Sequence, residues 1–283
     1  MQDKAWDVAR ALDAASMEIG RMEARLLLRH ATGISASAIA AHPERVLTPA
    51  EQGQFQTLVA RRAAGEPIAY LVGTREFYGR EFSATPDVLI PRPETELLVE
   101  LGLAKLAGMQ LGAAAPRILD LGCGSGCIAV TLALECRNAQ VTAVDHSTAA
   151  LAIARRNAEA LGASLRCIES DWCAALGEGE DGRFHLIVSN PPYIRADDPH
   201  LAQGDLRHEP PAALASGSDG LDALRQIIAS APAHLLPGGW LLLEHGYDQA
   251  EAVRDLLTAG GYSDLEQHRD LAGILRVSAS RRP

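Results

Sequence analysis

The chain has 283 residues, of which 47% are hydrophobic and 22% are charged. This balance is typical of folded globular proteins and excludes a largely disordered chain. The net charge of −10 argues against a protein whose affinity depends on covering a long stretch of phosphate backbone, so we expect no direct nucleic-acid partner. Residues 1–80 hold ten Lys and Arg against nine Asp and Glu, so a nearly neutral module precedes a distinctly acidic one.

The sequence predicts a cytoplasmic protein. It contains no run of about 18 apolar residues, and its first seven residues, Met-Gln-Asp-Lys-Ala-Trp-Asp, are unlike a signal peptide, so we expect no membrane segment. Five cysteines have no paired spacing typical of zinc sites, and we predict reduced thiols, mostly in the core, and no bound metal. These cysteines are Cys123, Cys127, Cys136, Cys167 and Cys173.

The first part of the chain has the apolar spacing of helices. Ile19, Met22 and Leu26 follow this spacing, and so do Phe55, Leu58 and Val59. Glycine and proline interrupt the pattern, so we predict four or five short helices in a small all-α domain over residues 1–74. It carries no catalytic constellation, which favours a scaffold or partner-docking role.

A linker precedes the second domain. Residues 76–82 alternate aromatic and polar side chains around Gly79, which predicts a β-hairpin within residues 75–92. Pro93-Glu94-Thr95-Glu96 then opens a helix, because proline suits the first turn and acidic side chains favour the positive end of the helix dipole.

Residues 93–283 alternate strand-like and helical patterns. This order predicts an α/β domain with a doubly wound, mostly parallel, seven-stranded sheet of the Rossmann-like kind. Near the C-terminus, two strand-like runs lack a helix between them, which predicts an antiparallel edge hairpin. The predicted strands are Arg117–Leu121, Gln140–Asp145, Ser164–Glu169, Phe184–Ser189, Trp240–Glu244, Tyr262–His268 and Ile274–Ala279, with helices over Leu151–Leu161 and Leu221–Leu235.

The first strand of this domain runs into a glycine-rich loop, Gly122-Cys123-Gly124-Ser125-Gly126. Glycines there let a ligand approach the main chain at a helix start. A dinucleotide fingerprint has its third glycine three positions after the second, but here the third glycine is Gly126 and that position is Cys127. The spacing therefore favours an adenosyl sulfonium cofactor. Asp145 ends the next strand and can accept both ribose hydroxyls; the alternative is a helix cap.

Two further residues follow the third strand. Asp171 can accept a hydrogen bond from an adenine amino group, and Trp172 offers an aromatic face at the strand end where such sheets bind ligands. The alternative for Trp172 is ordinary buried surface.

The most specific segment is Ser189-Asn190-Pro191-Pro192-Tyr193. Two prolines fix the backbone and remove donors, which leaves the side-chain oxygen of Asn190 and the carbonyl of Pro191 as acceptors for one group. A planar amide or amine nitrogen has two N–H donors that two acceptors can hold, while Tyr193 packs on the flat face. A sulfonium methyl donor is already activated, so alignment can supply roughly 7–11 kcal/mol of the barrier.

Other side chains are predicted to have structural roles. The histidines His146, His185, His208 and His245 show no paired metal spacing, and no Ser/His/Asp or Cys/His set is recognisable. Lys105 is predicted to be solvated. The segment 244–246 either lines the pocket or is structural.

Together these motifs resemble the release-factor glutamine methyltransferase family. The resemblance extends over nearly the whole chain, including the helical first domain, Ile90–Glu96, the glycine-rich loop, Ser170–Trp172, Asn190–Ile194 and Leu241–Gly246. It implies a cytoplasmic enzyme of translation termination. Such an enzyme methylates the glutamine amide of the Gly-Gly-Gln motif in class-one peptide chain release factors, using S-adenosylmethionine and releasing S-adenosyl-L-homocysteine. A departure is the apolar edge turn at 271–276.

Carried over residue by residue, the resemblance implies two groups of site residues, and it implies that the first domain helps to dock the release factor. The cofactor-binding group is Gly122, Cys123, Gly124, Ser125, Gly126, Asp145, Asp171, Trp172 and Asn190. The substrate-binding group is Asn190, Pro191, Pro192 and Tyr193, of which Asn190, Pro191 and Tyr193 are the predicted catalytic residues.

Several alternatives stay open at this point. A glutamine methyltransferase of a ribosomal protein shares the motifs, and only the first domain and the hairpin favour release factors. Nucleic-acid adenine methylation predicts a basic recognition region, which the acidic balance disfavours. A nicotinamide oxidoreductase predicts another glycine spacing, and a non-catalytic cofactor-binding partner leaves the substrate segment unexplained.

Overall fold

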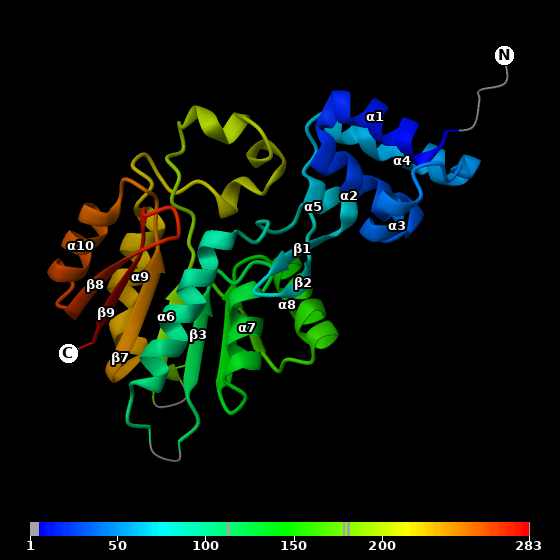
Figure 1. Cartoon of the computed structure of the whole chain (residues 1–283). Helices are drawn as coiled ribbons and strands as arrows, with labels where there is room; N and C mark the ends of the chain where they lie inside the picture. The colour runs from blue at the N-terminus through cyan, green and yellow to red at the C-terminus, as the bar shows by residue number, and fades with distance from the viewer. Residues whose placement is uncertain (1–5, 112–113, 178, 180–181, 283) are drawn as a thin grey trace. The chain divides into compact units, whose positions relative to one another are not determined.

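The computed structural model describes residues 6–111, 114–177, 179 and 182–282 (Figure 1). The chain divides into two compact units, Met1–Thr74 and Arg75–Pro283. Each unit has its own buried apolar cluster. Among the described residues, none of the helices has the length and apolar character that crossing a membrane requires.

The described part of the first unit is a bundle of five helices. Its helices are α1 Val8–Ile19, α2 Arg21–Thr32, α3 Ala36–Ala41, α4 Pro49–Ala63 and α5 Ile68–Val72. Local signals begin them: the side chain of Asp7 accepts a hydrogen bond from the amide of Arg10 in α1, and Thr48 and Glu51 form a reciprocal capping box at α4. These contacts satisfy amide groups that a helix start leaves unpaired.

The core of the bundle contains one of the two apolar sets predicted from spacing. Phe55, Leu58 and Val59 lie in a single buried cluster, and each large side chain that is buried contributes roughly 1.5–3 kcal/mol. Met22 and Leu26 instead face solvent, with 82% and 38% of their surface exposed. Helical spacing identified the helix there, but not which of its faces is buried.

A two-stranded hairpin leads into the second unit, made of β1 Thr74–Phe77 and β2 Arg80–Ser83. Phe77 and Phe82 are buried and meet edge to face, with ring centroids 6.0 Å apart. The amide of Ser83 donates to Asn157 Oδ1 at 2.8 Å, so the hairpin is joined to helix α8 (Thr148–Leu161). The hairpin therefore belongs physically to the sheet domain.

The second unit contains the predicted seven-stranded sheet. Its order is β5-β4-β3-β6-β7-β9-β8; neighbours among β3 to β7 pair in parallel, and β9 pairs antiparallel with β7 and β8. The sequence order of the strands reverses between β3 and β6. The bounds are β3 Arg117–Leu121, β4 Gln140–Asp145, β5 Arg166–Glu169, β6 Phe184–Ser189, β7 Leu235–Glu244, β8 Ser263–Arg269 and β9 Leu275–Arg281.

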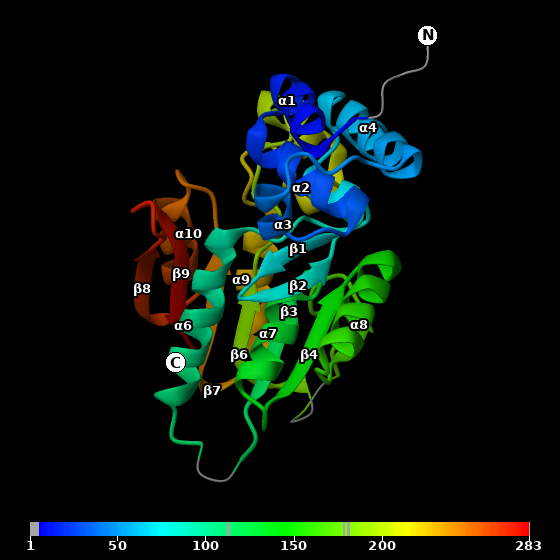
Figure 2. The same cartoon turned by 45° about the vertical axis from the view of Figure 1, so that its right-hand side comes forward.

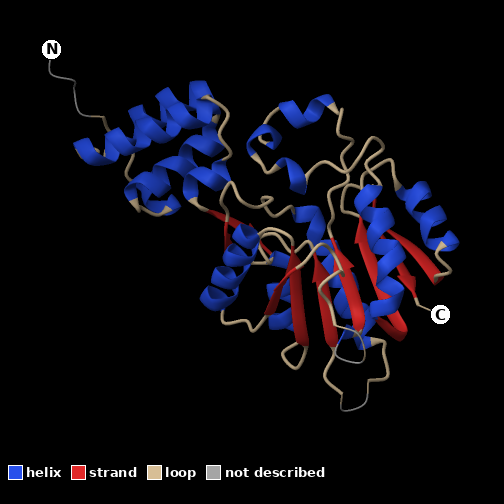
Figure 3. Ribbon diagram, turned by 180° about the vertical axis from the view of Figure 1, so that it is seen from behind, coloured by secondary structure: helices blue, strands red, loops and turns tan. Residues whose placement is uncertain are grey.

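Helices cover both faces of this sheet (Figure 3). Along β6, Leu186 and Val188 join the cluster with α6, α7 and α8, whereas Ile187 joins the cluster with α9 and α10, as alternation along a strand requires. The covering elements are η1 Pro93–Thr95, α6 Glu96–Ala107, α7 Cys127–Glu135, α9 Asp222–His234 and α10 Ala250–Ala259, with short 3-10 turns at Pro199–Ala202, Leu206–His208 and Pro211–Ala213.

Strand β7 begins at Leu235, five residues before the predicted start at Trp240. Its early part contains Pro237 and Gly238, and Gly238 has a φ of +73°, which is why the sequence disfavoured a strand. The pairing of Phe184 with Leu235, followed by a register shift, keeps this irregular segment in the sheet.

Candidate active site

The loops that carry the predicted site residues leave the sheet at one edge (Figure 2). In the parallel register, Leu121 lies beside Val144 and Ser189, so the carboxyl ends of β3, β4 and β6 are neighbours. The strand order reverses between β3 and β6, and open α/β sheets bind ligands in the crevice at such a point.

The glycine-rich loop adopts backbone conformations that other residues avoid. Gly122, Gly124 and Gly126 have φ values of +71°, +52° and +78°. A Cβ at Gly126 would lie 2.9 Å from the Cβ of Ala154, so this position also needs glycine for close packing at the start of α7. The loop can therefore bring main-chain amides against a ligand at a helix N-terminus.

Cys123 and Ser125 are buried within the same loop. Burial raises the pKa of the Cys123 thiol well above its usual range, so the sulfur stays protonated. The carbonyl of Ser125 accepts from Asn157 Nδ2 at 2.8 Å. Both residues thus contribute main-chain geometry to the loop and no reactive side chain.

Asp145 organises the loop through two hydrogen bonds. Its Oδ2 accepts from the amide of Gly124 at 2.9 Å, and its Oδ1 accepts from the amide of Ser147 at 2.9 Å. The cap of α8 is Ser147, which accepts from the amide of Ala150. A carboxylate oxygen can accept more than one hydrogen bond, so Asp145 keeps the capacity to bind ribose hydroxyls.

Asp120 lies two residues before the glycine-rich loop and was not among the predicted site residues. Its side chain is fully buried in β3; Oδ2 accepts from the amide of Ala129 at 3.1 Å, while Oδ1 has no hydrogen-bond partner among the described residues. Burial, reinforced by Asp145, raises the pKa of Asp120 to about 7. The available signal was a lone acidic residue inside the apolar run Ile118–Leu121.

Asp171 and Trp172 follow β5 at the same edge. Trp172 has a φ of +46°, which a bulky residue seldom adopts, and its ring carbons lie 3.4 Å from where a Cβ of Gly122 would be. The indole therefore stands against the glycine-rich loop. Asp171 is exposed at the rim, so its predicted contact with an adenine amino group stays a prediction.

Asn190 follows β6 directly. The hydroxyl of Ser189 donates to the carbonyl of Leu121 at 2.7 Å, which ties the end of β6 to β3. The Nδ2 of Asn190 donates to Thr95 Oγ1 at 3.1 Å, and Thr95 is buried in η1. This bond uses the donor side of the Asn190 amide and leaves the Oδ1 side for another partner.

Tyr193 is held from two sides. Its hydroxyl lies 3.5 Å from Glu244 Oε1, and its carbonyl accepts from Gln249 Nε2 at 3.0 Å. Burial, reinforced by Glu244, raises the pKa of Tyr193, so the phenol is neutral. Gly220 lies against the same carbonyl, where a Cβ would come within 2.3 Å of the oxygen.

Glu244 is a second residue whose place only the structure decides. It is fully buried at the end of β7, and burial raises its pKa to about 7, partly offset by the hydroxyl of Thr95. Its Oε2 has no partner at hydrogen-bond distance within the described ranges. The sequence left a pocket role and a structural role open for the segment 244–246. The 3.5 Å distance from Glu244 Oε1 to the Tyr193 hydroxyl favours a pocket role for Glu244.

A small hollow of about 70 Å³ adjoins the substrate segment. Glu209 fixes one wall, because its carboxylate accepts from Arg92 and, at 3.0 Å, from the amide of Ile90. The hollow is lined by Leu89, Arg92, Asn190, Pro191, Pro192, Tyr193, Ile194, Leu206, Ala213 and Leu214. Most of these side chains are apolar, which suits a flat uncharged group.

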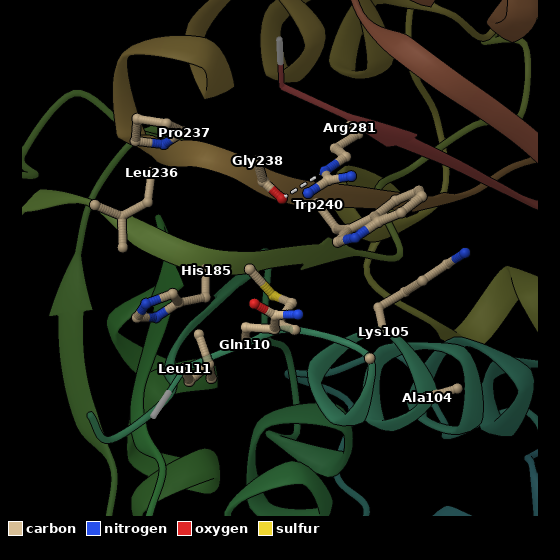
Figure 4. Close-up of a pocket in the computed structure, with 12 residues that line it drawn as sticks. Ala104, Lys105, Gln110, Leu111, His185, Leu236, Pro237, Gly238, Trp240 and Arg281 are labelled. Atoms are coloured by element: carbon tan, nitrogen blue, oxygen red, sulfur yellow. Dashed lines mark hydrogen bonds between the residues drawn. The ribbon is translucent and has the colours of Figure 1, made fainter. Parts of the chain in front are cut away.

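A larger hollow, of about 810 Å³, lies at the opposite end of the sheet domain (Figure 4). It contains Lys105, whose predicted solvation is wrong: the ammonium contacts both Glu266 oxygens at 2.6 and 2.7 Å and lies 3.9 Å from the centre of the Trp240 ring. None of the predicted site residues lines this hollow, and it adjoins the amino-terminal half of β7.

The buried histidine near the site is a structural residue. His245 Nδ1 interacts with the Gly246 carbonyl, its Nε2 interacts with Ser278 Oγ at 3.0 Å, and burial lowers its pKa. In the part of the chain that the structure describes, no group of three His, Cys, Asp or Glu side chains is placed to hold a metal.

Comparison with known families gives two matches along the chain. The PrmC N-terminal domain family matches residues 7–73, and the methyltransferase small domain family matches residues 100–217. The first match covers the helical bundle. The second covers the strands and loops that carry the glycine-rich loop and Asn190.

Curated relatives match nearly the whole length. The release factor glutamine methyltransferase of Bordetella pertussis is 55% identical over 91% of this chain and 93% of its own, and that of Burkholderia pseudomallei is 54% identical over 93% and 92%. The chain belongs to the release factor glutamine methyltransferase family. It is therefore a methyltransferase, with a family-typical helical domain ahead of the sheet domain.

Solved structures with lower identity share the fold. A methyltransferase from Pyrococcus furiosus has a TM-score of 0.53 and 20% identity, and covers 80% of this chain and 97% of its own. A T. thermophilus 16S rRNA N2 G1207 methyltransferase, solved with AdoMet and guanosine, has a TM-score of 0.52 and 24% identity, and covers 74% and 50%. At these identities the likeness concerns the fold alone.

Proposed function

We propose that this chain transfers a methyl group from S-adenosylmethionine to the side-chain amide nitrogen of the glutamine in the Gly-Gly-Gln motif of class-one peptide chain release factors. The observation that carries the proposal is the orientation of Asn190. Its amide nitrogen is engaged by Thr95, so its Oδ1 is the atom left to accept from a substrate N–H. The names of the relatives support the choice of substrate.

The residues of the glycine-rich edge suit the proposed cofactor. Glycines at 122, 124 and 126 let a ligand approach the main chain, and Asp145 can accept from ribose hydroxyls. Asp120 lies two residues before this loop, and its buried Oδ1 has no hydrogen-bond partner among the described residues. The indole of Trp172 offers an apolar face beside Gly122. When bound, the cofactor supplies a methyl group already activated by a positively charged sulfur.

The substrate side suits a carboxamide. The Oδ1 of Asn190 and the carbonyl of Pro191 are two acceptors for the two N–H donors of one planar amide, and the neutral Tyr193 packs beside its face. The adjacent hollow has a mostly apolar lining, which offers few competing hydrogen-bond partners for the substrate amide.

Alignment is the main task of this site. An amide nitrogen is a poor nucleophile, and holding it on a line with the methyl carbon can contribute roughly 7–11 kcal/mol. The nitrogen becomes acidic only as the new bond forms, so no strong base is needed. The proton can then leave along the Asn190 and Pro191 acceptors to solvent.

The helical first domain is proposed to dock the release factor. It matches a domain family of its own and has a separate core, as a docking module would. Since the proposed substrate acts in translation termination, we place the reaction in the cytoplasm.

A methyl-transfer assay tests the proposal. Purified chain receives labelled S-adenosylmethionine together with a class-one release factor, the same factor with its target Gln substituted, ribosomal protein or DNA. We expect label on the unmodified release factor only. Label on ribosomal protein would identify the alternative protein substrate, and label only on DNA would overturn the proposal.

A further inference from the structure

Thr95 has a hydrogen-bonding position that determines how Asn190 lies. The oxygen and nitrogen of an asparagine amide are nearly the same size, so hydrogen-bond partners alone decide which way the group faces. Here Thr95 Oγ1 accepts from Asn190 Nδ2 at 3.1 Å, and only 2% of the Thr95 surface is exposed. Because a hydroxyl can donate as well as accept, the partner of the Thr95 hydrogen decides which of the two amide orientations is favoured.

The candidate partner for the hydroxyl hydrogen of Thr95 is the carboxyl of Glu244. The Thr95 oxygen already accepts from Asn190, and the Thr95 hydroxyl lowers the pKa of Glu244, which burial raises. Glu244 is 1% exposed, and its Oε2 has no partner at hydrogen-bond distance among the described residues. A carboxyl group has an oxygen that can accept from the Thr95 hydroxyl whether or not the group is protonated, and the Thr95 lone pairs then face Asn190.

The same carboxyl group lies near the other substrate side chain. The Tyr193 hydroxyl is 3.5 Å from Glu244 Oε1. Burial raises the pKa of Tyr193, and the nearby carboxyl of Glu244 raises it further. One buried carboxyl group therefore borders both Asn190, through Thr95, and Tyr193, directly. These residues come from η1, the loop after β6 and the end of β7.

We propose that Thr95 and Glu244 are positioning residues that fix the orientation of the Asn190 amide and thereby the acceptor geometry of the substrate site. This inference rests on the proposed function for its substrate, but its structural part can be measured without substrate. If Asn190 turned over, its NH2 group would face the NH2 group of the bound glutamine. Two donors would then meet, and the substrate amide would lose one of its two acceptors.

The test compares two substitutions at one position. Thr95→Val removes the hydroxyl at nearly constant volume, whereas Thr95→Ser keeps it. We expect Thr95→Val to lower kcat with release factor by roughly 10- to 100-fold, in line with the cost of misplaced reacting groups. Thr95→Ser should stay within about threefold of the parent chain, and the KM for S-adenosylmethionine should change little in both.

A matched control removes another buried threonine hydroxyl. Thr131 in α7 is fully buried, and its Oγ1 has no hydrogen-bond partner in the described residues. Thr131→Val should therefore leave kcat unchanged. Glu244→Gln is a second variant, and it changes the contact from Glu244 through Thr95 to Asn190, which we call the relay. The new NH2 group can donate to Thr95, so we expect kcat to fall as it does for Thr95→Val.

The decisive readout needs no substrate. The side-chain amide signals of Asn190 in a proton–nitrogen spectrum are identified by their loss in Asn190→Ala. In Thr95→Val they should shift and exchange faster with water, whereas Thr95→Ser should retain them. Unchanged Asn190 signals and unchanged kcat in Thr95→Val would overturn the inference. An equal fall in kcat for Thr95→Val and Thr131→Val would overturn it too.

The two proposals fail in different ways. If the parent chain does not label release factor but the Asn190 signals depend on Thr95 as expected, the proposed function fails and the relay stands. If the parent chain labels release factor but the Asn190 signals are insensitive to Thr95, the relay fails and the proposed function stands.

Discussion

The two sides of the site are built in different ways. The glycine-rich side is supported by segments that follow it closely in the chain: Gly124 donates to Asp145, 21 residues further on at the end of the adjacent strand, and three glycines supply the left-handed turns. The Asn190 side is assembled from distant segments, with Thr95 and Glu244 lying 95 and 54 residues away along the chain. A motif can therefore mark both sides, but the contacts that support the Asn190 side come from segments much farther away in the sequence.

This comparison predicts that damage to Asn190 separates chemistry from cofactor binding. Asn190→Ala should lower turnover by roughly 100- to 1000-fold, the range found when one preorganised hydrogen-bonding group is removed from a site. Cofactor affinity, measured by calorimetry, should stay within a few fold, because the glycine-rich loop keeps its contacts. Weaker cofactor binding with normal transfer at saturation would contradict the role assigned to Asn190.

Damage to the glycine-rich side should instead affect folding and cofactor binding together. Gly126→Ala combines left-handed strain with a 2.9 Å contact to Ala154, and we expect a loss of about 2–4 kcal/mol in unfolding free energy. The comparison variant is Gly162→Ala, where φ is +74° but nothing lies within 4 Å of the new Cβ. Its loss should be about 1–2 kcal/mol, from strain alone. Equal losses would show that packing against Ala154 contributes nothing.

The smallest predicted effect concerns the pH dependence of stability. The pKa of Glu244 is raised from 4.5 to about 7, with Thr95, Arg276, Glu94 and Tyr193 facing its carboxyl group. The folded state then binds the proton more tightly than the unfolded state. The contribution of the Glu244 proton to the unfolding free energy is complete below pH 4.5 and is lost as pH rises through 7.

We therefore expect the stability of the parent chain, relative to Glu244→Gln, to fall by on the order of 1–3 kcal/mol between pH 4.5 and 8. Urea unfolding at several pH values measures it. The pKa of Asp120 is also raised, but Asp120 is present in both proteins, so its contribution to the pH dependence of stability cancels in the comparison. Parallel stability curves for the two proteins would contradict the buried placement of Glu244.

Much of the fold followed from local patterns. Strands β3, β4 and β6 have the predicted bounds, because each is a short apolar run between turn residues. The start of β7 was wrong by five residues, since pairing with β6 holds an irregular segment that its own sequence does not favour. Lys105 was wrong for a similar reason: its partners Glu266 and Trp240 lie more than 130 residues further along the chain.

The sequence by itself determined the order of strands and helices, the glycine-rich loop and the segment Asn190–Tyr193, because backbone conformation and strand ends depend on neighbouring residues. Only the tertiary structure decided that one buried oxygen of Asp120 has no hydrogen-bond partner within the described ranges. It also decided that Thr95 lies beside Asn190 and that Glu244 lies beside Tyr193. Burial and hydrogen bonding between distant segments have no local signature. The contact between Asn190 and Thr95 is one of these.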